Sequence, residues 1–227
     1  DVLRAKHDNV RALAALRDGR RLAIGTASWN ASDGRVELWD VGCVPPAHGA
    51  TINCCAGVKA LAALPDDRLA AGCADGVVRV VDVGTSAVVT TLSGHTGEVL
   101  ALVVLPRGRL ASGSADASVR VWDVGAQACV ATLTGHTREV LSMTVLADGR
   151  LASGASDFTA RLWDVDAHTC VCALHGVDAM AALPDGRLAT GSALTLQMAP
   201  SGYGTRGRQQ LLAPAVLRVP CRWRLWP

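Results

Sequence analysis

A histidine, a serine and an aspartate occur twice in this chain with identical intervals between them. The two sets are His95, Ser112 and Asp116, and His136, Ser153 and Asp157. These residue types are those of a hydrolase that uses a nucleophile, a general base and an orienting acid. A hydrolase needs such a set only once, whereas here the set recurs with the period of a longer repeat. The recurrence favours a structural role over catalysis.

The repeat that carries these residues is nearly letter for letter. Residues 110–124 read LASGSADASVRVWDV, and residues 151–165, which begin 41 positions later, read LASGASDFTARLWDV. Aspartates keep a similar period, at Asp40, Asp82, Asp123 and Asp164. Tryptophan precedes all of them except the second, where Val81 stands. A period of about 40 residues is typical of a stacked or ringed array of small units.

One unit predicts four short antiparallel strands. Residues 99–105 are an unbroken apolar run that ends at the turn sequence Pro-Arg-Gly, as expected for a covered inner strand. Residues 110–114 and 119–122 follow on either side of a tight turn, and the second of these alternates apolar with polar residues. Residues 129–133 form an outer strand. The sequence therefore predicts an all-β protein built from four-stranded units.

A Gly-His pair at residues 94–95 and again at 135–136, with Trp-Asp beginning 27 residues after each histidine, resembles the WD-repeat family. In that family each unit supplies one four-stranded antiparallel blade, and the blades surround a central channel. The resemblance implies an all-β β-propeller of about five blade units. It also implies a rigid platform that binds other macromolecules, usually without catalysis, and it does not name the partner.

The resemblance also implies how the polar residues interact. It places the turn aspartate between the histidine and the rest of the network, whereas a catalytic triad has the histidine between serine and aspartate. We therefore expect structural networks, made of His95, Ser112, Asp116 and Trp122 in the third unit and of His136, Ser153, Asp157 and Trp163 in the fourth. The second unit keeps Asp75 but has Ala71 and Val81 at the serine and tryptophan positions, and the first has Ile24 at the serine position. Those two units should depend on apolar packing and on their neighbours.

A single WD-repeat propeller spanning residues 1–227 would have units at 7–53, 58–93, 95–134, 136–174 and 177–227. In the fifth unit, residues 194–222 are rich in Gly, Pro and Arg and predict an irregular insertion. Residues 223–226 resemble 160–163 and predict the third strand of that unit. Residues 1–6 would then be a closing outer strand. The alternatives are that the chain is a fragment of a larger ring, or that the residues after 193 do not fold.

Composition excludes several classes of protein. With 227 residues, half of them apolar, the chain is long enough to bury a core without disulfide staples. Its first residues are not a signal peptide, and no apolar run is long enough to cross a membrane. Eight cysteines occur without a CxxC pair, so zinc is a poor interpretation and free thiols in the reducing cytoplasm or nucleus are expected. No cofactor or metal is expected.

The predicted function is a non-enzymatic scaffold for protein–protein interaction. A first alternative is the substrate-recognition propeller of a ubiquitin ligase complex. A second is a nucleic-acid-associated propeller, because six arginines follow Asp185, the last acidic residue. The scarcity of lysine throughout makes nucleic acid the weaker choice.

Loops that precede inner strands or join second to third strands emerge on one side of a propeller. The partner-binding residues predicted there are Asp8, Asn9, Trp29, Asn30, Glu98, Arg138, Glu139 and Ser156.

Overall fold

The computed structural model describes residues 9–28, 33–177, 179–183, 188–191 and 215–217. Within these ranges it contains antiparallel strands and one short 3-10 turn, η1 (Pro106–Gly108). The prediction of an all-β protein made of four-stranded blades is confirmed. Among the described residues no helix is long and apolar enough to span a membrane. The proposed closing strand at 1–6 lies outside the described residues.

Five antiparallel sheets follow one another along the chain, and we call them blades 1 to 5. Blade 1 contains β1 (Asn9–Ala15), β2 (Arg21–Ala27), β3 (Gly34–Asp40) and β4 (Ala47–Asn53). Blade 2 contains β5 (Val58–Ala63), β6 (Arg68–Cys73), β7 (Val78–Asp82) and β8 (Ala87–Leu92). Blade 3 contains β9 (Val99–Val104), β10 (Arg109–Ser114), β11 (Val119–Asp123) and β12 (Ala128–Leu133). Blade 4 contains β13 (Val140–Val145), β14 (Leu151–Ala155), β15 (Thr159–Asp164) and β16 (Thr169–His175), and blade 5 contains β17 (Ala179–Ala182), β18 (Leu188–Gly191) and β19 (Ala215–Leu217).

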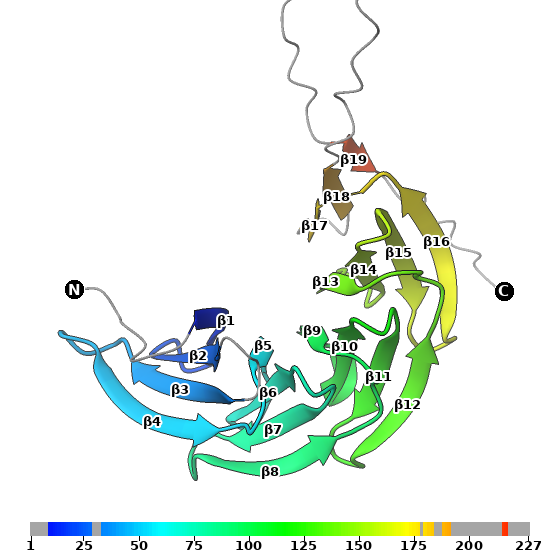
Figure 1. The fold of residues 1–227 in the computed structure, drawn as a ribbon. Helices are drawn as coiled ribbons and strands as arrows, with labels where there is room; N and C mark the ends of the chain where they lie inside the picture. Colours follow the sequence, from blue (N-terminus) through cyan, green and yellow to red (C-terminus); the bar gives the residue numbers. More distant parts are fainter. Residues whose placement is uncertain (1–8, 29–32, 178, 184–187, 192–214, 218–227) are drawn as a thin grey trace, which may run out of the picture.

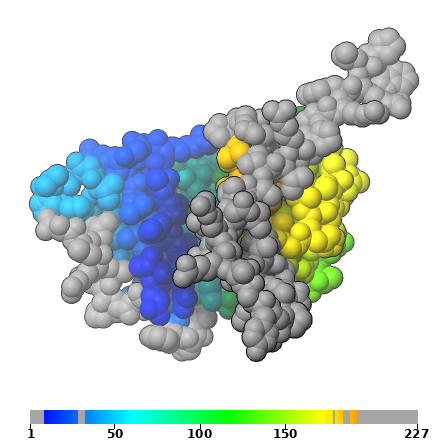
Figure 2. Space-filling model, turned by 90° about the horizontal axis from the view of Figure 1, so that it is seen from above, coloured from blue at the N-terminus to red at the C-terminus, as the bar shows by residue number. Residues whose placement is uncertain are grey.

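The blades stand side by side in an arc, with the first strand of each blade on the concave side and β4, β8, β12 and β16 on the convex side (Figure 1). Neighbouring first strands contact one another from β1 through to β17. The arc formed by the described residues stays open between blade 1 and blade 5. Figure 2 looks onto this open side, with blade 1 in blue on one flank and β16 in yellow on the other.

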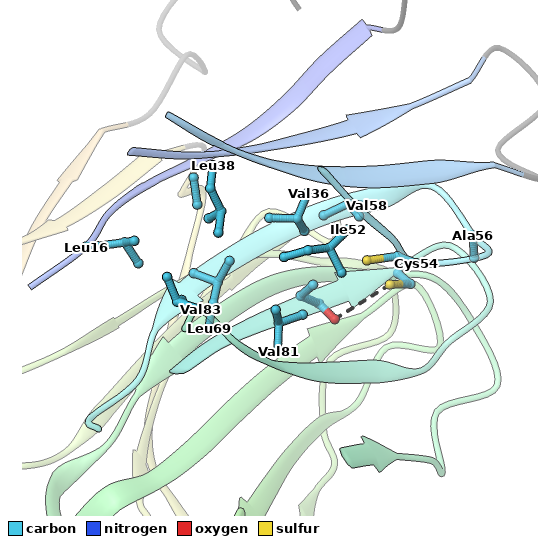
Figure 3. Packing of buried hydrophobic residues seen from close by; sticks show 13 residues of the cluster. Leu16, Val36, Leu38, Ile52, Cys54, Ala56, Val58, Leu69, Val81 and Val83 are labelled. Carbon is cyan, nitrogen blue, oxygen red and sulfur yellow. Dashed lines mark hydrogen bonds between the residues drawn. The ribbon is translucent and has the colours of Figure 1, made fainter. Parts of the chain in front are cut away.

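The hydrophobic core lies between blades, where the face of one sheet packs on the face of the next. Buried residues form four clusters, one at each junction between consecutive blades. Figure 3 shows the cluster between blades 1 and 2. At three of these junctions a valine that begins a blade packs on a glycine in the second strand of the preceding blade. The pairs are Gly25 with Val58, Gly72 with Val99, and Gly113 with Val140, and a Cβ on the glycine would come within 2.7, 2.6 and 2.6 Å of the valine Cγ1 respectively. The glycines therefore permit the sheets to pack closely.

The fifth blade differs from the sequence-based expectation. Its third strand is β19, which pairs with β18 through Leu188↔Leu217, Ala189↔Val216 and Thr190↔Ala215. The structure therefore places a short strand inside the predicted insertion at 194–222. Residues 223–226, which were predicted to form the third strand of this unit, lie outside the described residues. The other residues of 194–222 lie outside the described ranges.

Candidate functional site

Two regions are candidate sites: the buried polar networks of blades 3 and 4, and the face formed by the loops above the inner strands. In blade 3 the Trp122 indole N–H donates to Ser112 Oγ at 2.7 Å. Ser112 Oγ lies 2.7 Å from His95 Nε2. On the other side of the imidazole, His95 Nδ1 lies 2.8 Å from Asp116 Oδ2. The four side chains thus form one continuous chain of hydrogen bonds.

Blade 4 repeats this arrangement. Trp163 donates to Ser153 Oγ at 2.7 Å, and Ser153 Oγ lies 2.8 Å from His136 Nε2. His136 Nδ1 is 3.1 Å from Asp157 Oδ2. The structure therefore brings together all eight residues that the sequence assigned to the two networks.

The order of groups within each network corrects the sequence analysis. His95 lies between Ser112 and Asp116, which is the order of a catalytic triad and not the order that the resemblance implied. The expected order was therefore wrong: both imidazole nitrogens are engaged, and the aspartate meets only one of them.

Burial supplies a better argument that these networks are structural. Both Ser112 and Ser153 have no exposed surface, and both histidines are only 7% exposed. Each serine oxygen also accepts the indole N–H, which reduces its strength as a nucleophile. A substrate carbonyl could not approach either oxygen without displacing the tryptophan that packs against the preceding blade. The networks therefore hold each blade together and present no reactive group to solvent.

The protonation states follow from the partners. Burial lowers the pKa of both His95 and His136 below the ordinary value, and this effect outweighs the opposing influence of the neighbouring aspartate. A neutral imidazole accepts from Ser112 at Nε2 and donates from Nδ1 to Asp116, which matches the observed order. Burial by itself would raise the pKa of Asp116. Hydrogen bonds from Ser118, Thr96 and His95 outweigh burial and hold that pKa well below its usual range.

Each aspartate ties two loops together. Asp116 accepts from the backbone N–H of Thr96 at 3.0 Å, and Thr96 lies in the loop that precedes the inner strand. It also accepts from the N–H and the hydroxyl of Ser118 at 2.9 and 2.6 Å, within the turn between β10 and β11. Thr159 replaces Ser118 in blade 4 and donates to Asp157 at 2.6 Å. The networks thereby fix the shape of loops that reach the surface.

Blade 2 replaces the histidine, serine and tryptophan of the network with a thiol and two small apolar residues. Cys54 stands 41 residues before His95, in the histidine position. Ala71 and Val81, at the serine and tryptophan positions, have no exposed surface. Asp75 keeps its place but pairs with Arg79 at 2.6 Å. In blade 1, Trp39 donates to Glu37 at 3.1 Å because Ile24 occupies the serine position.

The second region is the surface formed by the loops that precede inner strands and the turns that join second to third strands. We call it the loop face. These two kinds of loop bond to each other, as Ala115 N–H does to Glu98 O and Ser156 N–H to Glu139 O, both at 2.9 Å. This pairing places them on one side of the arc. Of the predicted partner-binding residues, Arg138 and Glu139 are exposed and Ser156 is half-buried.

The other predicted partner-binding residues fall into two groups. Asn9 begins β1 and is half-buried, and Glu98 forms an ion pair with Lys59 at 2.9 Å. Asp8, Trp29 and Asn30 lie outside the described residues. The structure therefore brings only part of the predicted set to a surface that can be described.

Sequence reasoning missed Phe158, the chain's only phenylalanine. It lies in the turn between β14 and β15 with φ +57° and is 55% exposed. The same turn position holds Gly76 in blade 2 and Ala117 in blade 3, both also at positive φ. An alignment of the repeats would have found it, because Phe158 is the one bulky residue at a position otherwise occupied by small ones.

Within the described part of the chain, no three His, Cys, Asp or Glu side chains gather closely enough to hold a metal ion.

The repeats match the family model of the WD domain, G-beta repeat, over residues 43–82, 86–123 and 127–164, which together make up about half of the chain. The chain belongs to the WD-repeat family. Each matched stretch begins near the outer strand of one blade and ends with the third strand of the next. A comparison with curated proteins finds no match.

Proposed function

We propose that this chain is a non-enzymatic scaffold that binds partner proteins through its loop face. WD repeats generally serve as protein-interaction platforms, and buried networks in blades 3 and 4 hold surface loops in place. Loops that vary on a fixed scaffold are the usual location of binding residues. The seven described cysteines are all free, which supports a reducing compartment such as the cytoplasm or nucleus.

The observation that carries this proposal is the conformation of Phe158. A bulky residue rarely adopts positive φ, and holding it there costs on the order of 1 kcal/mol or more. The fold supports the turn through bonds from Phe158 N–H to Ala155 O at 3.1 Å and from Val177 N–H to Phe158 O at 3.0 Å. An exposed aromatic ring in a strained turn lowers stability without filling the core, which supports a role in binding.

The surroundings of Phe158 favour a protein partner. Arg138 and Glu139 are exposed in the adjacent loop, and Ser156 lies two residues away in the same turn. An aromatic ring beside charged groups of both signs suits a polypeptide surface, since interfaces combine an apolar anchor with a polar rim. A nucleic acid would require a predominantly basic surface.

The test is a quantitative pull-down from cell extract with the intact chain and with the double variant Phe158→Ala and Arg138→Glu. The matched control is Val130→Ala with Arg107→Glu, which removes an exposed valine from β12 and reverses an arginine of η1, away from the loop face. We expect the loop-face variant to lose partners that the control keeps. Equal recovery of every partner by both variants would contradict the proposal.

The ubiquitin-ligase receptor is a narrower version of the same proposal, and recovery of ligase subunits with the intact chain would support it. The nucleic-acid alternative depends on the arginines after Asp185, which all lie outside the described residues. Binding of RNA or DNA that weakens steeply with salt would favour it.

A further inference from the structure

A polar pocket lies between blades 3 and 4 on the side of the arc opposite the loop face. We call this side the opposite face, and it consists of the turns that join first to second strands and third to fourth strands. The pocket has a volume of about 270 Å³. Its charged lining consists of Arg107, Arg109, Arg150, Asp148, Asp164 and Asp166. The lining is therefore highly charged but has no net charge.

Arg107 departs from the repeat at the turn between the first and second strands of blade 3. The same position holds Asp66 in blade 2 and Asp148 in blade 4. Each of these aspartates forms an ion pair with the arginine that begins the second strand of its own blade. In blade 3 that arginine is Arg109, and the positive charge of Arg107 cannot take the place of the missing aspartate.

Asp166 departs from the repeat at the turn after the third strand of blade 4. The other blades have a glycine two residues after the aspartate that ends this strand, namely Gly42, Gly84 and Gly125 in blades 1 to 3. Asp166 Oδ1 accepts a hydrogen bond from Arg109 Nη2 at 2.7 Å, across the junction between blades 3 and 4. This bond lowers the pKa of Asp166, so the carboxylate is ionised at neutral pH. Asp166 thereby replaces the aspartate that Arg109 lacks in its own turn.

The fold makes little use of Arg107 itself. Its side chain is 78% exposed, and its Nη1 lies 3.9 Å from Asp166 Oδ2, which is too long for a hydrogen bond. An ion pair of this kind between exposed groups contributes little to stability. The backbone of Arg107 has φ +62°, a conformation that is unfavourable for residues other than glycine. Arg107 and the second oxygen of Asp166 are thus a cation and an anion that a ligand can engage.

The remaining charges of the pocket have partners within the fold. Arg150 Nε donates to Asp148 Oδ2 at 2.7 Å. Asp164 Oδ1 accepts from the backbone N–H groups of Asp166 and Ala167 at 3.0 and 2.9 Å. A ligand with charge of a single sign would meet one attractive and one repulsive group. A ligand with one anionic and one cationic group would satisfy both.

The size of the pocket favours an extended polypeptide. The volume is below the range of about 300–1,000 Å³ that is usual for sites of small molecules and cofactors. An α-helix, about 10–12 Å across with its side chains, is too wide to enter a pocket of this volume. In an extended chain, side chains two residues apart point to the same side. We propose that the pocket binds an extended segment of a partner protein that carries an acidic and a basic residue two positions apart, with the acidic group on Arg107 and the basic group on Asp166.

This site adds a second binding face to the proposed scaffold. It rests on the proposed role in protein binding, but its residues are separate from those of the loop face. In the pull-down described above, the control that contains Arg107→Glu should keep the partners of the loop face and lose those that bind at the opposite face. The two sites can therefore be tested independently.

The experiment measures binding of the intact chain to a fluorescent peptide that carries Glu-Ala-Lys within a Gly-Ser sequence. We expect it to bind several-fold more tightly than matched peptides with Glu-Ala-Glu or Lys-Ala-Lys. Arg107→Asp restores the residue type of blades 2 and 4, so it should keep the melting temperature and weaken binding several-fold. Arg138→Asp makes the same charge change on the loop face and should bind the peptide as the parent does.

A double-mutant cycle tests the individual contacts. Replacing the peptide glutamate by glutamine should weaken binding to the parent several-fold but have little effect on Arg107→Gln, which keeps a long polar side chain. Replacing the peptide lysine by glutamine should likewise have little effect on Asp166→Asn.

Three results would overturn the proposal. One is equal binding of the three peptides, or tighter binding of either peptide with charges of a single sign. Another is an equal loss of binding in Arg107→Asp and Arg138→Asp, which would indicate a general effect of net charge. The third is a cycle in which the effects of the peptide and protein substitutions simply add. None of these results bears on the loop face, whose own test is the variant with Phe158→Ala.

Discussion

Blades 2 and 3 have the same strand register but are held together differently. Leu69 is opposite Val81 in blade 2, and Leu110 is opposite Trp122 in blade 3, at equivalent steps of the ladder. Both inner strands shift register one residue after their first valine. Strand pairing and apolar packing therefore suffice to form a blade, and the hydrogen bonds of the His-Ser-Trp-Asp network stabilise it further.

The two blades also differ in what a lost side chain would leave behind. In blade 3, each network residue satisfies a neighbour that is itself buried, so removing one leaves polar atoms without partners. In blade 2 the positions of histidine, serine and tryptophan hold Cys54, Ala71 and Val81, which need few partners. Blades 3 and 4 should therefore be sensitive to single substitutions, and blade 2 should tolerate polar groups poorly.

The largest expected effect is at the histidine of a complete network. His136→Ala should destabilise the protein by about 2–4 kcal/mol, because it leaves Ser153 and Asp157 buried without their partner. His168→Ala is the matched control, since His168 is exposed in the turn between β15 and β16. Denaturant unfolding measures both variants. Equal midpoints would contradict a stabilising role for the network.

Two reverse substitutions at the serine position test the comparison between the blades, and each should have a smaller effect on stability. Ser112→Ala should cost about 1–3 kcal/mol, because His95 and Trp122 both lose a buried partner. Ala71→Ser places a hydroxyl at the same position of blade 2, where tryptophan and histidine are missing, and should also destabilise, by about 1–2 kcal/mol. If Ala71→Ser stabilised the protein, the interpretation that apolar packing holds this part of blade 2 together would be wrong.

The repeat made the fold and the membership of both networks predictable, because period and residue type recur together. The order of groups within the network was not predictable, since spacing along the chain does not say which imidazole nitrogen meets which neighbour. The residue at the histidine position of blade 2 was missed for a similar reason. Cys54 was considered with its neighbour Cys55, although its place 41 residues before His95 indicates the position it fills. In blade 5, β19 was missed because three apolar residues within a long segment give too weak a pattern.

The pH dependence of stability should also distinguish the blades. Because both histidines have a lowered pKa when folded, the unfolded chain binds more protons as the pH falls below about 6.5, the ordinary histidine value. Stability present above that pH is therefore lost on acidification. A second loss begins below about 3.8, the ordinary value for Asp116 and Asp157. Hydrogen exchange between pH 7 and 5 should show protection falling more in β10 and β14 than in β6, and equal losses would contradict this assignment.

The smallest expected effect concerns the turn between β14 and β15. Phe158→Gly should stabilise the protein by up to about 1 kcal/mol, because glycine adopts positive φ without strain, as Gly76 does in the same turn of blade 2. The same variant should weaken partner binding, since the exposed ring is lost. Thermal unfolding and the pull-down together separate the two effects. A variant that is less stable than the parent would mean that the Phe158 ring packs favourably on its own blade, and the case for a binding anchor at this turn would be lost.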